Sequence, residues 1–314
     1  MTVAIGAPLH NGVDFVEEAL GSLVAQTYPD FRLVLVDDAS TDGTGEVAAR
    51  VAARDERVSL ERNPARLGMA ANWRRAQELA LRAAPDARCF AWASDHDVWE
   101  PRFLEVLVAE LDAHPQAALA FPRSVRIGAA GEVLGESPPF SSATLAEPHR
   151  RARSVAWGMR PGDAVYGLMR QEHLRRTGGF RAVMEPDRLL LLELSLQGEL
   201  RQVPELLWRR RFASLPGRAG RARQRRALFP GPPPAHSRLV PLFVHAALLA
   251  RDYALRGRGR PSLGRLRALQ VAVETALIDL SHDMRRELFG AGRRLLGLAG
   301  RAVRALRRRA PVAR

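Results

Sequence analysis

Residues 31–44 read FRLVLVDDASTDGT, in which an apolar run gives way to acids, hydroxyl residues and glycine. The run Phe31–Val36 has the length and composition of a buried strand. The polar cluster after it is typical of a turn and a helix cap. Apolar residues then recur at helical spacing over Thr44–Ala53. The stretch therefore predicts a strand, a turn that begins with two aspartates, and a helix.

Strand-like and helix-like segments alternate on both sides of this stretch. Such an alternation implies a mostly parallel sheet with helices on both faces, which is an α/β fold. The predicted strands are Val3–Ala7, Phe31–Val36, Val58–Glu61, Cys89–Ala93 and Ala117–Phe121, and the predicted helices are Val13–Gln26, Thr44–Ala53, Met69–Ala83 and Pro101–Ala113.

The pattern weakens in the second half of the chain. Residues 124–162 are irregular, apart from a predicted hairpin at Gly128–Gly135. Further strands are predicted at Ala164–Met169, Arg201–Val203 and Leu206–Arg211, and a helix at Leu189–Gln197. Residues 213–237 are rich in Arg, Pro and Gly, and helical spacing returns over residues 239–309. We therefore expect an α/β domain over residues 1–211, a linker over 212–238 and a helical basic extension over 239–314.

The charge of the chain is unevenly distributed. Its 314 residues carry a formal net charge of +14, yet residues 209–314 hold 25 arginines against 5 acidic residues, so residues 1–208 are mildly acidic. The start of the chain lacks the features of a signal peptide, and no run reaches the ~18 apolar residues of a membrane span. A single cysteine, Cys89, excludes an internal disulfide framework. We expect a cytoplasmic protein.

Polar residues gather where four of the predicted strands end. The carboxyl ends of parallel strands lie at one edge of a sheet, and ligands of open α/β sheets bind there. The residues in question are Pro8, His10, Asn11, Asp37, Asp38, Asn63, Asp95, His96 and Asp97. They come from four places far apart in the sequence, so their convergence predicts a ligand site at this edge.

Four stretches carry a resemblance to a known family. They are PLHNGVDFVEEALGSLVAQTYPDFRLVLVDDASTDGT (8–44), NPARLGMAANW (63–73), WASDHDVWEP (92–101) and GGFRAVMEPDRLLLLELSLQGELRQVPELLWRRR (178–211). In this order and spacing they resemble family-2 glycosyltransferases, which are inverting enzymes of the GT-A fold. The resemblance covers residues 2–211. It implies transfer of a sugar from a nucleotide-sugar donor to an acceptor hydroxyl.

The resemblance also implies a nucleotide-sugar site at the strand ends. Asp38 matches the acid that accepts a hydrogen bond from the base, and Asp37 lies beside it. Both acids have an alternative reading as turn and cap residues, and Asn72 has one as an exposed helix residue. The positions that the resemblance implies are Pro8, His10, Asn11, Asp37, Asp38, Gly68, Asn72 and Asp95.

The stretch WASDHDVWEP implies a divalent metal, Mn²⁺ or Mg²⁺, on the donor diphosphate. Asp95 and Asp97 form an Asp-x-Asp pair, but His96 stands where relatives carry the main metal-binding aspartate. Three alternatives follow. Asp95 and Asp97 hold the metal after a shift of the loop, or His96 is a ligand, which suits Mn²⁺ better than Mg²⁺, or the metal affinity is weakened.

Inversion needs a carboxylate that accepts the proton of the acceptor hydroxyl. Asp187 matches that base, because Gly198 follows it by the family's spacing. Pro186 replaces the usual Glu, and Glu185 stands one position earlier. A helix N-cap is the alternative reading of Asp187. Trp99 either lines the sugar pocket or packs against the sheet.

From Arg285 onward the sequence predicts a basic amphipathic helix. One reading is peripheral binding to an anionic membrane at the inner face of the cell membrane, which suits a lipid-linked or other cell-envelope glycan acceptor. The other is a helix docked on the α/β domain. Nucleic acid is not expected, because no binding module accompanies the charge. A non-catalytic scaffold on the same fold and a nucleotidyltransferase are the alternative functions.

Overall fold

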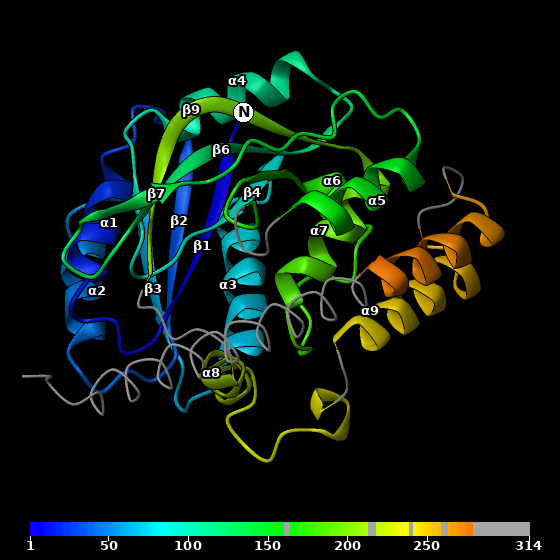
Figure 1. The fold of residues 1–314 in the computed structure, drawn as a ribbon. Helices are drawn as coiled ribbons and strands as arrows, with labels where there is room; N and C mark the ends of the chain where they lie inside the picture. Colours follow the sequence, from blue (N-terminus) through cyan, green and yellow to red (C-terminus); the bar gives the residue numbers. More distant parts are fainter. Residues whose placement is uncertain (160–163, 213–217, 239–240, 259–262, 279–314) are drawn as a thin grey trace, which may run out of the picture.

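The computed structural model describes residues 1–159, 164–212, 218–238, 241–258 and 263–278. Strands and helices alternate through the first half of the chain, as expected (Figure 1). In chain order the elements are β1 (Val3–Leu9), α1 (Val16–Val24), β2 (Phe31–Asp37), α2 (Thr44–Ala52), β3 (Val58–Arg62), α3 (Met69–Ala83), β4 (Cys89–Trp92), β5 (Val98–Trp99), α4 (Phe103–Ala113), β6 (Ala117–Ile127), β7 (Val133–Glu136), α5 (Pro148–Gly158), β8 (Leu168–Arg170), α6 (Gln171–Leu174), α7 (Pro186–Gln197), β9 (Glu199–Arg211), α8 (Arg218–Leu228), the 3₁₀ turn η1 (Ala235–Arg238), α9 (Pro241–Leu249) and the π-helical turn η2 (Ala250–Leu255). Residues 265–278 are also helical.

The described strands form one sheet in the order β3-β2-β1-β4-β8-β6-β9-β5, with β7 paired to β6. The pairs β3·β2, β2·β1, β1·β4 and β6·β9 are parallel. The short strand β8 is antiparallel to both of its neighbours, β4 and β6. The expected mostly parallel α/β sheet is therefore confirmed.

The register places the ends of β1, β2 and β3 at the same edge of the sheet. Leu9 of β1 lies opposite Asp37 of β2, and Asp37 lies opposite Arg62 of β3. On the other side of β1, Gly6 lies opposite Trp92 at the end of β4. The loops that follow these four strands therefore meet, as expected for parallel strands.

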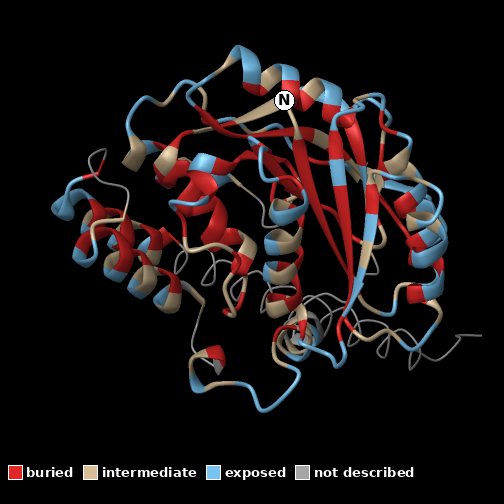
Figure 2. Cartoon of the chain, turned by 180° about the vertical axis from the view of Figure 1, so that it is seen from behind, coloured by how far each residue is buried: buried red, intermediate tan, exposed pale blue. Residues whose placement is uncertain are grey.

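Each face of the sheet has its own apolar core, because successive side chains of a strand point to opposite faces. One core joins Ile5, Leu33 and Leu35 to helices α1, α2 and α4. The other joins Val34, Val36 and Phe90 to α3, α5 and α7. Figure 2 shows the central strands mostly buried, whereas exposed residues lie on the outer surfaces of the helices and on parts of the outer strands.

The second half of the chain differs from the prediction in three places. β9 is one strand whose pairing with β6 shifts near Pro122 and Arg123, so the two predicted short strands are parts of a single irregular one. The hairpin at Gly128–Gly135 is present as β6 and β7, whereas the strand predicted at Ala164–Met169 is limited to β8, Leu168–Arg170. Part of the predicted linker is helical, namely α8.

The end of α8 and the helices after it share a core with the sheet. Leu228, Leu249, Tyr253 and Val271 are buried in the same cluster as α3 and α7. Figure 1 shows α9 and the helix at 265–278 beside α7, on the side away from α1 and α2. No helix in the described part of the chain is long and apolar enough to cross a membrane. The predicted basic helix from Arg285 onward lies outside the described residues.

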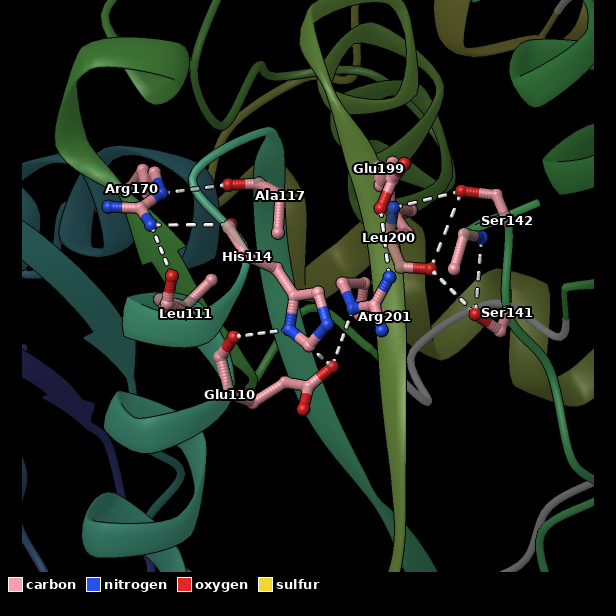
Figure 3. Close-up of polar contacts among 11 residues, drawn as sticks. Glu110, Leu111, His114, Ala117, Ser141, Ser142, Arg170, Glu199, Leu200 and Arg201 are labelled. Carbon is pink, nitrogen blue, oxygen red and sulfur yellow. Dashed lines mark hydrogen bonds and ion pairs between the residues drawn. The ribbon is translucent and has the colours of Figure 1, made fainter. Parts of the chain in front are cut away.

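At the amino edge of the sheet, a polar cluster joins α4 to the starts of β6 and β9 (Figure 3). Arg201 Nε lies 2.5 Å from Glu110 Oε1, and Arg201 Nη1 lies 3.0 Å from Glu199 Oε2. His114 Nδ1 lies 2.9 Å from the carbonyl oxygen of Glu110. Buried Arg170 donates to the carbonyls of Leu111, His114 and Ala117. The bonds of His114 and Arg170 satisfy carbonyls at the end of α4 and at the start of β6, and the ion pairs of Arg201 join α4 to β9, so the cluster is structural.

Candidate functional site

The loops after β1 and β2 are bonded to each other. The backbone N–H of Asn11 donates to Ser40 Oγ at 3.0 Å, and Asn11 Oδ1 accepts from the N–H of Thr41 at 3.0 Å. Asn11 and Ala39 have positive φ angles of 50° and 55°. Non-glycine residues adopt this conformation mainly where the surroundings enforce it. The exposed side chain of Asn11 is thus held at the rim of the site.

Asp37 is fully buried at the end of β2, and both carboxylate oxygens are used internally. Its Oδ1 accepts from the N–H of Ser40 at 3.0 Å, and its Oδ2 accepts from Arg62 Nε at 3.1 Å. Both bonds are typical of an acid that stabilises a turn, which is the alternative role predicted for Asp37 from the sequence. Asp37 therefore shapes the loop on which Asp38 stands.

Asp38 is buried and ties the β3–α3 loop to the end of β2. Its Oδ1 accepts from Asn63 Nδ2 at 2.9 Å and from the N–H of Leu67 at 2.7 Å. Its Oδ2 accepts from the N–H of Gly68 at 2.9 Å. A carboxylate offers about four acceptor positions, so Oδ2 keeps capacity for one further donor.

Asn72 is buried in α3, so its alternative reading as an exposed helix residue is wrong. Its Nδ2 donates to the carbonyl of Val36 at 3.0 Å, and its Oδ1 accepts from Asn63 Nδ2 at 2.9 Å. Asn72 therefore reaches Asp38 through Asn63. Its amide fixes the position of α3 against β2.

Gly68 precedes α3 with a φ of 85°. A Cβ at this position would lie 2.6 Å from Pro230 Cδ, a separation that real Cβ atoms essentially never show. The segment after α8 therefore packs directly on the loop that Asp38 holds. Only glycine fits both the backbone conformation and this close approach.

Asp95 joins the loop after β4 to the loop after β1. Its Oδ2 accepts from the backbone N–H of His10 at 3.1 Å, and its Oδ1 lies 2.7 Å from His96 Nδ1. Gly12 lies so close that a Cβ there would stand 2.9 Å from Asp95 Oδ2. The buried Nδ1 of His10 has no hydrogen-bond partner within the described residues. Pro8, by contrast, is a buried residue of β1.

His96 and Asp97 occupy different environments. The His96 side chain is 43% exposed, whereas that of Asp97 is 1% exposed. Asp97 Oδ1 accepts from the N–H of Arg211 at 2.7 Å and lies 3.9 Å from His96 Nε2. Burial raises the pKa of Asp97, and the nearby His96 counteracts this only in part. Burial would lower the pKa of His96, but the hydrogen bond to Asp95 and the charge of Asp97 outweigh it, so that pKa is raised.

The described residues contain no group of three or more His, Cys, Asp or Glu side chains that could hold a metal ion unaided. A metal at Asp95-His96-Asp97 would therefore need further ligands besides these side chains. The 2.7 Å contact between Asp95 and His96 Nδ1 resembles the carboxylate–histidine pairs that orient metal-binding imidazoles, and it leaves Nε2 free to coordinate. One imidazole nitrogen facing one carboxylate oxygen fits Mn²⁺ when phosphate oxygens and water complete the sphere.

Asp187 lies in the first turn of α7, which begins at Pro186 and not at the predicted Leu189. Glu185 is the N-cap residue, with a φ of 52°, so the alternative reading of Asp187 as the N-cap is wrong. Burial raises the pKa of Asp187, and the charge of Glu185 raises it further. The N–H of Arg188 and the charge of Arg210 act in the opposite direction.

The sequence did not single out Arg210 and Arg211 beside this site. The charge of Arg210 acts on His96, Asp97 and Asp187, which places a cation near both halves of the site. Arg211 is buried, and its Nε donates to the carbonyl of His96 at 2.9 Å. The only signal for either residue is the run of three arginines that ends β9. Their approach to Asp97 depends on the pairing of β9 with β5.

Trp99 is 2% exposed and belongs to the core between the sheet and α1, α2 and α4. It pairs with Trp208 of β9, and its backbone N–H donates to Ser22 Oγ at 3.1 Å. Of its two predicted roles, packing against the sheet is confirmed.

Comparison with known proteins agrees with this architecture. Residues 4–176 match the family model for glycosyl transferase family 2. TuaG of Bacillus subtilis (strain 168), named for teichuronic acid biosynthesis, is 29% identical over 103 residues, which are 33% of this chain and 39% of that protein. EpsE of the same organism, named as a glycosyltransferase, is 31% identical over 113 residues, which are 36% of this chain and 39% of that protein. The matched stretches thus span well under half of these curated relatives.

Solved structures with this fold can be superposed on nearly the whole chain. TarS 1–349 of S. aureus has a TM-score of 0.60 and 15% identity, covering 90% of this chain and 72% of that one. The mannosyltransferase PcManGT of Pyrobaculum calidifontis, solved with GDP-Man and Mn²⁺, has a TM-score of 0.51 and 21% identity, covering 93% and 79%. These likenesses confirm the GT-A fold. The family model, the order of the four sequence stretches and the shared fold together show that the chain belongs to glycosyl transferase family 2.

Proposed function

We propose that the chain transfers a sugar from a nucleotide-sugar donor to an acceptor hydroxyl, with inversion at the anomeric carbon. The observation that carries this proposal is the convergence of the loops after β1, β2, β3 and β4 on one edge of the sheet, where the side chain of His96 is 43% exposed. The structures of TarS with UDP-GlcNAc and of PcManGT with GDP-Man support a nucleotide-sugar as donor.

The donor site we propose combines the remaining acceptor position of Asp38 Oδ2 with the exposed face of the β1 loop. A base N–H would donate to Asp38, as the family resemblance implies. His10 and Asn11 would lie beside the base and ribose, with buried Pro8 beneath them. The unpartnered Nδ1 of His10 supports a polar ligand there, because buried polar atoms are normally hydrogen-bonded. Asp37, Gly68 and Asn72 would act indirectly, through the bonds that hold the Asp38 loop.

Asp187 is the base in this proposal. The acceptor oxygen forms a bond to the anomeric carbon, the bond from that carbon to the diphosphate breaks, and the hydroxyl proton passes to the Asp187 carboxylate. The raised pKa of Asp187 favours this role, because a base works best when its pKa approaches the working pH. The charge of Arg210 would favour the departing diphosphate.

We further propose that a divalent metal, preferably Mn²⁺, binds between His96 Nε2, Asp97 and the donor diphosphate, with Asp95 orienting the imidazole. When bound, the cation would neutralise charge on the leaving diphosphate. The support is the chemistry of the donor set and the Mn²⁺ in PcManGT. Of the three alternatives from the sequence, ligation by His96 fits these contacts best.

For the acceptor we propose a cell-envelope glycan, lipid-linked or otherwise, as the name of TuaG suggests for that relative. A peripheral contact with an anionic membrane at the inner face of the cell membrane would bring the enzyme to such a substrate. The arginine-rich sequence after residue 285 supports such a membrane contact. The helix at 265–278 also supports it, because the helix carries exposed apolar residues beside two exposed arginines. The apolar residues are Leu266, Leu269, Val273 and Leu277, and the arginines are Arg265 and Arg267.

Two experiments test the proposal. Incubation with UDP-, GDP- and dTDP-sugars should release a nucleoside diphosphate, and Asp187→Asn should slow transfer by at least about 100-fold. A chain that neither transfers nor hydrolyses any donor would be a scaffold. Release of pyrophosphate from a nucleoside triphosphate would indicate a nucleotidyltransferase. Co-sedimentation with anionic vesicles should be stronger for the full chain than for residues 1–284, and equal sedimentation would refute the membrane contact.

A further inference from the structure

The segment Thr177–Met184, which leads directly to Asp187, is held by residues from the C-terminal part of the chain. It joins α6 to α7 and includes the loop Gly178-Gly179-Phe180. Three of its carbonyls and one of its side chains bond to residues beyond position 235. The contacts are Arg258 Nη1 to Thr177 O, Asp252 Oδ2 to Arg181 Nη2 at 2.8 Å, His236 Nε2 to Ala182 O at 3.1 Å, and His245 Nε2 to Met184 O at 2.9 Å.

The contact of His245 is the most deeply buried of the three carbonyl contacts. The side chain is completely shielded from solvent in α9, and Nδ1 has no hydrogen-bond partner within the described residues. Burial lowers the pKa of His245 to about 4, so the ring is neutral at physiological pH. A carbonyl only accepts, so the single ring proton must lie on Nε2. The ring is therefore a fixed hydrogen-bond donor and not a proton carrier.

Only Glu185 and Pro186 separate the bonded carbonyl of Met184 from Asp187. Glu185 has a φ of 52°, which is strained for a residue with a side chain, and Pro186 has a ring-restricted φ. Strained backbone persists only where its surroundings over-determine it. The hydrogen bond from His245 holds the carbonyl of Met184 and therefore fixes the peptide bond between Met184 and Glu185. It is thus one of the contacts that can maintain the positive φ of Glu185.

We propose that His245 is a positioning residue for transfer: its Nε2–H holds the carbonyl of Met184, and so sets where the Asp187 carboxylate faces the acceptor. The inference rests on the role of Asp187 proposed above. His236, Asp252 and Arg258 hold the same segment further from Asp187. The helices after residue 235 are then part of the acceptor side of the site.

The test compares three substitutions of His245 in the full-length chain. His245→Gln brings a side-chain N–H close to the position of Nε2. His245→Asn is shorter and places its N–H near Nδ1, away from Met184. His245→Leu removes the donor. The matched control is His114→Leu, which removes a ring-to-carbonyl bond of 2.9 Å at the opposite edge of the sheet (Figure 3).

For each variant, the melting temperature, nucleotide affinity, kcat and KM for the acceptor are measured beside Asp187→Asn. We expect His245→Asn and His245→Leu to lose roughly 10- to 100-fold in kcat, because misplacement by about 1 Å costs that much, while nucleotide affinity stays within about twofold. His245→Gln should retain most of the activity. His114→Leu should lower the melting temperature and leave kcat unchanged.

Wild-type kcat in His245→Leu would overturn the proposal. Equal losses of kcat in His245→Gln and His245→Asn would also overturn the proposal, since the ring would then matter only for packing. These two variants test the hydrogen bond even if His245→Leu does not fold. A wild-type kcat in Asp187→Asn would instead refute the assignment of the base, and the two failures are therefore distinguishable.

Discussion

The imidazole of His96 is bound to the carboxylate of Asp95, with Nδ1 lying 2.7 Å from Oδ1. The other ring nitrogen faces Asp97 Oδ1 at 3.9 Å. His96, which stands between the two aspartates, is thus oriented by Asp95 and directed toward Asp97. A histidine at this position need not impair the site, because Asp95 gives the ring a defined tautomer.

Exchange of His96 for Asp should change the metal preference. We expect wild type to prefer Mn²⁺ over Mg²⁺ for nucleotide binding, and His96→Asp to use both ions more equally, because Mg²⁺ favours oxygen ligands. Calorimetric titration of nucleotide at a series of metal concentrations measures this. Asp95→Asn should weaken Mn²⁺ affinity by about 10- to 100-fold, since the carboxylate that orients the ring is lost. An unaltered metal preference in His96→Asp would remove His96 from the ligand set.

Removal of the base should separate binding from chemistry. Asp187→Asn should lower kcat by about 10²- to 10⁴-fold, the usual contribution of a general base, with nucleotide affinity unchanged. Steady-state kinetics and nucleotide titration on the same preparation measure both. Asp14 is an exposed acid in the turn before α1, so Asp14→Asn is the control and should have wild-type kinetics.

The charge of Glu185 should set the acid limb of the pH–rate profile. Burial and Glu185 both raise the pKa of Asp187. The active base is the ionised form, so transfer is lost as pH falls through this raised pKa. Glu185→Gln removes one of the two causes, and the midpoint of the acid limb should move to lower pH. Glu172→Gln, a substitution at an exposed acid, is the control and should leave the midpoint of the acid limb unchanged. An identical midpoint in wild type and Glu185→Gln would show that a group other than Asp187 titrates.

Arg211 should be important for stability, unlike its neighbour Arg209. Buried Arg211 donates to the carbonyls of His96, Gly128 and Ala129. Arg211→Ala should destabilise the fold by about 2–4 kcal/mol, because three carbonyls, of which that of Gly128 is buried, lose a charged donor. Arg209 makes an exposed ion pair, so Arg209→Ala should cost less than about 1 kcal/mol. Urea denaturation measures both, and equal effects would contradict the assigned burial.

Gly68 should not tolerate a side chain. With a φ of 85° and Pro230 Cδ 2.6 Å from an added Cβ, Gly68→Ala should cost about 2–4 kcal/mol and weaken nucleotide binding through the Asp38 loop. Gly21→Ala is the control, because a Cβ there meets nothing within 4 Å and alanine favours the interior of α1. Its stability should be unchanged or slightly higher. A Gly68→Ala protein as stable as wild type would mean that the Pro230 segment moves aside at no cost.

The sequence predicts the first half of the fold well, because the signals there are local. The helix Met69–Ala83 has the predicted bounds, and the strands from Val3 to Cys89 differ by a few residues at their ends. α8 was missed because its sequence is rich in arginine and carries almost no apolar pattern. β9 was divided in two because its pairing is irregular where Pro204 and Glu205 interrupt the apolar pattern.

For the site, the sequence predicts which residues lie together but not how they are bonded. Strand ends indicate which residues meet, so Asp38 and Asp95 could be named. Their partners could not, since the bonds from Asn63 to Asp38 and from Asp95 to the His10 N–H depend on loop conformation. Arg210 and His245 were missed because they approach the site only through tertiary contacts, by way of β9 and α9 respectively.

Calorimetric titration of the full-length chain with UDP, GDP and dTDP, each with Mn²⁺ and with EDTA, is the most direct test of a metal-dependent nucleotide site. We expect one nucleotide to bind in the presence of Mn²⁺, EDTA to weaken this binding at least about tenfold, and His96→Ala to remove the difference between Mn²⁺ and EDTA. Absence of binding for all three nucleotides, with and without metal, would contradict a nucleotide-sugar site at this edge of the sheet.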